Sequence, residues 1–168
     1  MKALITLLLL AGLTSAAPRP TFAQHDHAAH PGTTALRHDP VFRGVLNKQL
    51  KYPYGAQHNG LFTRLFIGFD VDGRGRITNV TSLMPLRSQL GFETTVEKAL
   101  ARMPHLHPRY EGHYVLPVAF VLRSYERGAP LHEPTAALPL RLLGKRIMLD
   151  EVRVIAGSHG TPTQLIYQ

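Results

Sequence analysis

The sequence contains no cysteine, so the chain forms no disulfide bond and depends on its hydrophobic core for stability. Its only long apolar run, Ala3–Leu13, is too short to cross a bilayer comfortably. The basic residues are scattered without a run of five or more, although the formal net charge is +8, and no nucleic-acid-binding motif is present. With 44% hydrophobic residues in 168, the chain suffices for one packed domain with tails.

The first 23 residues have the organisation of a secretory signal peptide. Lys2 precedes the apolar run Ala3–Leu13, and small residues at Ser15–Ala17 and Thr21–Ala23 offer two cleavage sites. We therefore expect export, with the mature protein in a bacterial periplasm. If the segment is not cleaved, it would instead anchor the chain in the inner membrane.

Residues 24–40 are polar, carry two prolines and lack an apolar period, which predicts a flexible leader. Imidazole nitrogen binds zinc and copper, so an envelope protein that handles these metals is an alternative hypothesis. The leader holds four histidines: His25, His27, His30 and His38.

Residues 41–125 carry the periodicity of a folded domain. Helical spacing of apolar residues predicts helices, and alternation predicts strands. Pro117 lacks an N–H and belongs at an edge or a bulge. Ile77 is out of step with Val80, which predicts a bulge there. The predicted helices are Val41–Leu50 and Gly91–Met103, and the predicted strands are Leu61–Val71, Ile77–Met84 and His113–Arg123.

Residues 126–168 begin with a turn-rich link and end in a loose tail over 157–168. Between them, Leu140–Ala156 has the pattern of a β-hairpin around Gly144 and Lys145. We expect this hairpin to add extra strands to the domain.

The stretch FDVDGRGRITNV, residues 69–80, resembles the start of an EF-hand calcium loop. A calcium hand needs oxygen ligands at its fifth and twelfth positions and a helix on each side. Here Arg74 and Thr81 hold those positions, and the flanks have the period of strands. The stretch is therefore interpreted as a hairpin turn.

The order helix, Tyr52–Pro53 with Ala56, the FDVDGRGRITNV hairpin, the helix FETTVEKALARM, then Pro108, Gly112 and YVLPVAFVLR resembles the C-terminal domain of the TonB family over about residues 45–123. The resemblance implies an α+β fold with a three-stranded antiparallel sheet in the order β-β-α-β and packed helices. Residues 24–40 reach only about 60 Å when fully extended, so the long spacer of a force-transmitting member is missing.

The function implied by the resemblance is binding. An extended segment of an outer-membrane TonB-dependent receptor, or of another envelope protein, would add as a strand to the exposed sheet edge. By analogy the last strand is the docking edge and Tyr52–Pro53 lies nearby. The partner-binding residues predicted in this way are Tyr52, Pro53, Val115, Leu116, Val118, Phe120 and Leu122.

The segment Met148–Gly157 loosely resembles the receptor strand that such domains bind. It could pair with the domain's own edge, or with another copy in a homodimer, or form an ordinary extra strand.

An enzyme is not expected. Cysteine is absent as a nucleophile, and the segment GSHG at 157–160 lacks the spacing of a nucleophile elbow. His105, His107 and His113 could face one way but have no evident carboxylate partner. We predict no catalytic residue, no resident metal and no cofactor.

Overall fold

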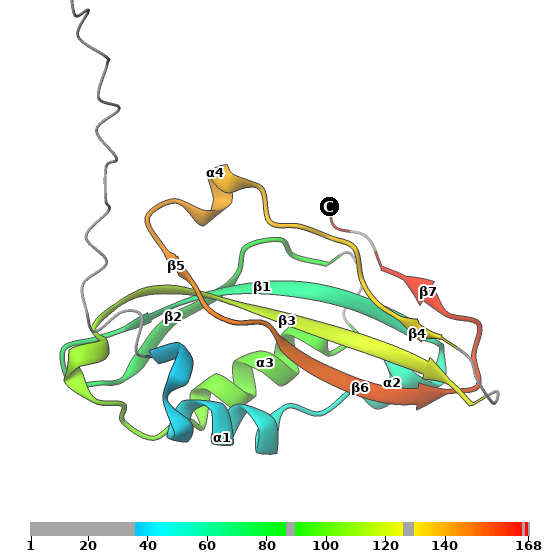
Figure 1. The fold of residues 1–168 in the computed structure, drawn as a ribbon, viewed down its shortest axis with the longest axis horizontal. Coiled ribbons are helices and arrows are strands. Elements are labelled where there is room, and N and C mark those ends of the chain that lie inside the picture. Colours follow the sequence, from blue (N-terminus) through cyan, green and yellow to red (C-terminus); the bar gives the residue numbers. More distant parts are fainter. Residues whose placement is uncertain (1–35, 87–89, 126–129, 166, 168) are drawn as a thin grey trace, which may run out of the picture.

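The computed structural model describes residues 36–86, 90–125, 130–165 and 167. The predicted signal peptide, most of the leader and the three histidines at 25, 27 and 30 lie outside these residues. The described chain is a mixed α+β structure with one sheet of seven strands (Figure 1). The expectation of an α+β fold is confirmed, whereas the expected number of three strands is wrong.

Most predicted elements of the domain are present. A short 3-10 turn, Leu36–His38, precedes α1, and a second one, Pro108–Tyr110, precedes β3. The helices are α1 (Pro40–Gln49), α2 (Tyr54–His58), α3 (Phe92–Ala101) and α4 (Leu140–Leu143). The strands are β1 (Leu61–Val71), β2 (Ile77–Ser82), β3 (Gly112–Ser124), β4 (Leu131–His132), β5 (Ile147–Met148), β6 (Val152–Ser158) and β7 (Thr163–Gln164).

The long central strand is β3. It pairs antiparallel with β1 along residues 112–120, and β1 pairs antiparallel with β2. On β3 the parallel partners are β5 and β6, and β4 pairs antiparallel near its end. Finally, β7 pairs with the start of β1. The part of the chain predicted as a link, a hairpin and a tail therefore contributes four strands to the same sheet.

The predicted bulge in β2 is present, and Pro117 also lies at a bulge. Two residues of β2 stand opposite Phe69 of β1, and the bulged Asn79 has φ 52°. Asparagine tolerates this left-handed conformation better than most residues, and its side chain donates a hydrogen bond to Asp70 over 2.7 Å. At Pro117, the register between β3 and its parallel partners shifts by one residue, from Val115↔Met148 to Val118↔Val152.

The predicted hairpin at 140–156 is wrong. Its first part forms α4, and β5 and β6 then follow one another along β3 instead of pairing together. Both run parallel to β3 and in the same direction as each other. Residues 147–158 therefore pair with the backbone N–H and C=O groups of β3 and not with each other. Residues 114–122 of this long strand are buried, so their backbone groups need partners within the protein.

The helices and the core lie on one face of the sheet. Alternate residues of β1 and β3 point toward α1 and α3, and the aromatic rings of Phe92 and Phe120 meet edge to face at 4.8 Å. The other face is crossed by residues 130–146, where Arg64 donates a hydrogen bond to the carbonyl of Ala136 over 2.7 Å. In Figure 1 α1 and α3 lie below the sheet and α4 lies above it.

Candidate functional site: the open edge of β6

The predicted docking edge on β3 is not open. The side chains of Val115, Leu116, Val118, Phe120 and Leu122 are all at most 1% exposed. Along one side β3 pairs with β1, and along the other with β5 and β6. The prediction that a guest strand reaches this edge is therefore wrong for the described fold, because the chain's own residues 147–158 already occupy it.

Pro117 explains where this pairing is interrupted. Phe66, which stands opposite Pro117, directs its carbonyl to Leu83 on the β2 side, so the ring nitrogen of Pro117 faces β5 and β6. Proline offers no N–H to that side. Three residues, 149–151, stand opposite the two residues 116 and 117, which is a bulge that avoids the missing donor.

The free edge of the sheet on this side belongs to β6. Backbone N–H and C=O groups of successive residues in a strand point alternately to opposite sides. The parallel register with β3 directs Val152, Val154 and Ala156 inward, so Arg153 and Ile155 direct their backbone groups outward. Among the described residues no strand pairs with this outer edge.

Helix α2 covers the end of the same edge. Gln57 donates a hydrogen bond from Nε2 to the carbonyl of Gly157 over 2.8 Å, and Ser158 donates from Oγ to the Gln57 carbonyl over 2.7 Å. The Gly157 carbonyl points outward, as the alternation requires. The open stretch is therefore limited to residues 152–156.

A groove runs beside the open stretch. It has a volume of about 280 Å³ and lies between the end of α1, the connection to α2, and β6. Ile155 is an apolar side chain at this edge that is 49% exposed. The groove is lined by Asn47, Leu50, Lys51, Tyr52, Val152, Arg153, Val154 and Ile155.

Tyr52 forms a rigid wall of the groove. Its hydroxyl donates a hydrogen bond to the carbonyl of Leu61 over 2.6 Å, and its ring packs edge to face on Phe92 and Phe120. Burial raises the pKa of the Tyr52 hydroxyl, so it stays neutral. Of the seven predicted partner-binding residues, only Tyr52 lines this groove. Pro53, next to it, is half-buried and begins α2.

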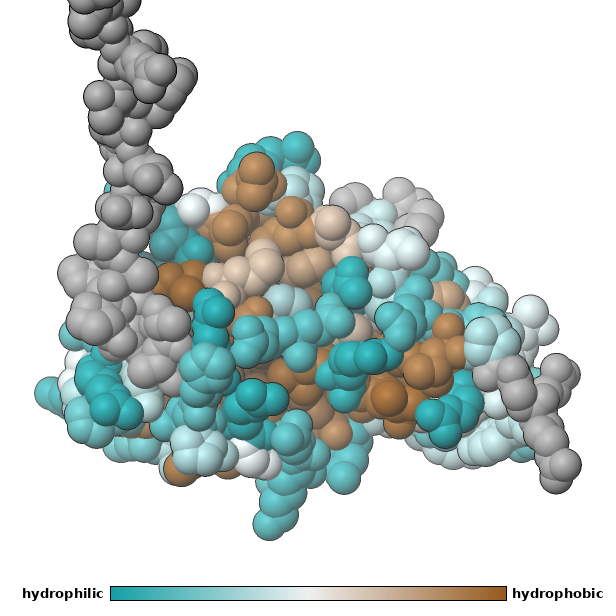
Figure 2. All heavy atoms as spheres, in the orientation of Figure 1, coloured by the Kyte–Doolittle hydropathy of each residue, from teal (hydrophilic) through white to brown (hydrophobic). Residues whose placement is uncertain are grey.

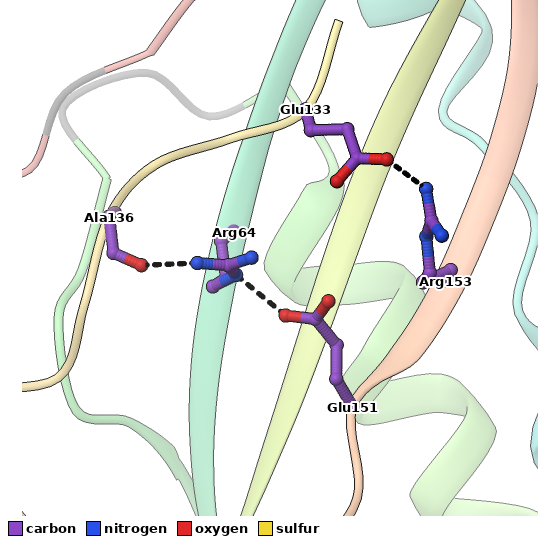
Figure 3. Close-up of polar contacts among 5 residues, drawn as sticks. All are labelled: Arg64, Glu133, Ala136, Glu151 and Arg153. Atoms are coloured by element: carbon purple, nitrogen blue, oxygen red, sulfur yellow. Dashed lines mark hydrogen bonds and ion pairs between the residues drawn. The ribbon is translucent and has the colours of Figure 1, made fainter. Parts of the chain in front are cut away.

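The charge of the groove comes from Lys51, which is exposed. The side chain of Arg153 instead forms an ion pair with Glu133 on the opposite face of the sheet (Figure 3). Among the described residues, no acidic side chain lines the groove. An extended segment that carries a carboxylate is therefore favoured over a basic one.

The turn at residues 72–76 is structural. Asp72 accepts hydrogen bonds from the backbone N–H groups of Arg74 and Arg76, and it also pairs with the Arg76 guanidinium at 2.8 Å. The hydrogen bond from the Arg76 backbone contributes most to lowering the pKa of the Asp72 carboxyl. This carboxylate is therefore engaged by the turn itself, as the hairpin interpretation predicts.

A second, polar cleft of about 400 Å³ lies at the other end of the sheet. Ser124 Oγ and His132 Nε2 lie 3.4 Å apart there, and His159 packs on Tyr125. Among the described residues, no carboxylate contacts His132 in the way that the acid of a hydrolase triad orients its histidine. Among all the residues that the structure describes, no three histidine, aspartate or glutamate side chains cluster to hold a metal.

Comparisons of the chain with protein-family models, with curated protein sequences and with solved structures found no match. Within residues 36–167, as far as the structure describes them, no helix has the length and apolar character to cross a membrane.

Proposed function

We propose that this chain is an exported binding module with a TonB C-terminal-like fold, acting in the periplasm in connection with energy-coupled outer-membrane transport. It captures an extended segment of an outer-membrane receptor or another envelope protein. The segment adds as a strand to the outer edge of β6, with its side chains in the groove beside Tyr52. This differs from the family analogy in the docking strand, since β3 is occupied.

The observation that carries the proposal is the open edge itself. Arg153 and Ile155 together present two N–H donors and two C=O acceptors, at a place where Tyr52 and Leu50 provide apolar surface. Exposed edges of this kind bind extended peptides through main-chain hydrogen bonds, and adjacent pockets select the side chains. The element order of residues 45–123 supports the TonB-like assignment of the fold.

The first experiment locates the docking edge. Since the chain contains no cysteine, Ile155→Cys provides a single reactive thiol at the edge, and Tyr54→Cys on α2 is the matched exposed control. We expect crosslinking in the envelope to trap a partner from position 155 and not from position 54. Mass spectrometry then identifies the trapped segment.

The second experiment tests strand addition with a synthetic peptide of that segment. Ile155→Pro removes an outward N–H without removing a bond to β3, whereas Ile155→Ala keeps this N–H and removes the side chain. We expect calorimetry to show a loss of at least about tenfold in affinity for the proline variant beyond that of the alanine variant. Equal affinity of the two variants would contradict strand addition at β6.

A further inference from the structure

A leucine-rich segment crosses the face of the sheet opposite the helices. We name residues 134–149 the leucine strap; it contains five leucines, no acidic residue and the three basic residues Arg141, Lys145 and Arg146. Acidic residues flank it on both sides, at Glu133 and Asp150. Within the strap, apolar and basic side chains are therefore concentrated in a short stretch.

The strap exposes apolar surface. Leu140 is 84% exposed at the start of α4, and Met148 is 36% exposed. A shallow groove of about 520 Å³ lies beside Met148, and Phe66, Pro117, residues 136–138 and the paired Arg64 and Glu151 also line it. Figure 2 shows the apolar side chains gathered over this part of the molecule. An exposed patch of this kind indicates an interaction surface.

The basic side chains around the patch are available. Arg141 and Lys145 are exposed, and among the described residues neither they nor Arg146 lie within 4 Å of a carboxylate. By contrast, Arg37 and Arg64, which also lie close to this part of the chain, are both paired with acids. The free positive charge is thus found next to the exposed leucine.

From this arrangement we infer that the leucine strap docks on an anionic lipid bilayer. Helix α4 stands out from the sheet (Figure 1), and it begins with the highly exposed Leu140. A projecting apolar side chain fits a soft flat surface better than a cleft. Leu140 enters the interface while Arg141 and Lys145 contact acidic headgroups. A second copy of the chain docked on the same patch would bring like charges together. A nucleic acid would contact the basic side chains through its phosphates but would leave the central leucine without an apolar contact.

Tryptophan fluorescence tests this directly, because the chain contains no tryptophan. Leu140→Trp places the only indole at the tip of the strap, and Tyr54→Trp on α2 is an equally exposed control on the helix side. The measurement uses the mature protein, purified after its export from the cell. We expect a blue shift of the emission of Leu140→Trp with vesicles of equal parts phosphatidylglycerol and phosphatidylcholine, none with phosphatidylcholine alone, and none from the control.

A charge variant gives the second arm. Arg141→Gln with Lys145→Gln in the Leu140→Trp background should weaken vesicle binding by roughly tenfold or more, whereas Lys48→Gln with Lys98→Gln on α1 and α3 should not. The inference is overturned if the emission does not respond to anionic vesicles, or if the charge variant binds as tightly. It is also overturned if the shift appears with protein concentration in the absence of lipid, which would indicate self-association.

Discussion

The two faces of the sheet are covered in different ways. On the helix face, α1 and α3 pack on alternate residues of β1 and β3, and aromatic rings such as Phe92 and Phe120 contact each other throughout the core. On the other face, residues 130–146, which are mostly irregular, cross the same two strands. Arg64 on this face donates a hydrogen bond to the carbonyl of Ala136 and also pairs with Glu151 (Figure 3).

Because of this difference, the helix face contributes most of the folding stability, and the opposite face has more exposed apolar surface. Helices cover a sheet with continuous apolar surface, so on the helix face the surface open to a partner is limited to the groove between α1 and the outer edge of β6. An irregular segment covers only part of the sheet, which leaves a groove beside Phe66 and an exposed Leu140. We therefore expect substitutions on the helix face to change the free energy of unfolding most, and those on the strap face to change it less.

The largest effect is expected for Phe120→Ala. This side chain is fully buried and its ring contacts Tyr52 and Phe92 edge to face, so removing it leaves a cavity in the core. We expect a loss of about 3–5 kcal/mol in the free energy of unfolding, measured by urea denaturation. Tyr54→Ala, which removes an exposed ring, is the control and should change stability by less than about 0.5 kcal/mol.

Phe66→Ala is the matching substitution on the strap face. Phe66 is 4% exposed but borders an existing groove, so water and the strap can fill the space that it leaves. We expect a loss of about 2 kcal/mol in the same measurement. A loss equal to that of Phe120→Ala would show that the two faces are packed equally well.

A smaller effect is expected for Glu151→Gln. The Arg64 Nε and Glu151 Oε2 atoms lie 2.6 Å apart, and both side chains are partly exposed. We expect a loss of about 1 kcal/mol that decreases with added salt, because such pairs are screened. Glu133→Gln removes the more exposed ion pair with Arg153 and should have almost no effect on stability. A larger loss for Glu133→Gln than for Glu151→Gln would contradict this ranking of the two ion pairs.

The smallest effect concerns acid pH. Burial works to raise the pKa of the Asp70 carboxyl, but hydrogen bonds from Asn79 and His113 and the charges of His113 and Arg146 outweigh it, so the pKa is lowered. The unfolded state then binds the proton more readily, and the stabilisation by this carboxylate is present above about pH 4 and lost as pH falls through the folded pKa.

Asp70→Asn should therefore destabilise the protein slightly at neutral pH and make its stability less dependent on pH in the acid range. Urea midpoints measured from neutral pH to about pH 3 check this. Asp72→Asn in the exposed turn, whose carboxyl also has a lowered pKa, is the comparison away from the strap. If the urea midpoint of Asp70→Asn falls with acid pH as steeply as that of the unchanged protein, the role of this carboxylate is refuted.

Local patterns predicted the individual elements well. The alternation of residues 61–71 predicted β1 with its observed bounds, and the phase change between Ile77 and Val80 predicted the bulge at Asn79. Pro117 was correctly expected at an edge or a bulge, since its missing N–H is a property of the residue alone. The end of β2 was placed two residues too far along the chain.

The docking site could not be predicted in the same way. Residues 147–158 have a strand pattern, but the pattern does not say which strand they pair with. They pair with β3 instead of with each other, which occupies the edge of the strand that carries five of the seven predicted partner-binding residues and leaves the outer edge at Arg153 and Ile155 open. Tyr52 lines the new groove only because β6 lies beside it.

By itself, the sequence determined the long helices and strands of residues 41–125 and the bulge in β2, because backbone conformation and the in–out alternation depend on near neighbours. Only the tertiary structure decided the order of the strands, and with it which amide groups remain open and which leucine stays in solvent. Pairing between distant segments depends on the competition among all available edges, and no short stretch of residues contains that information.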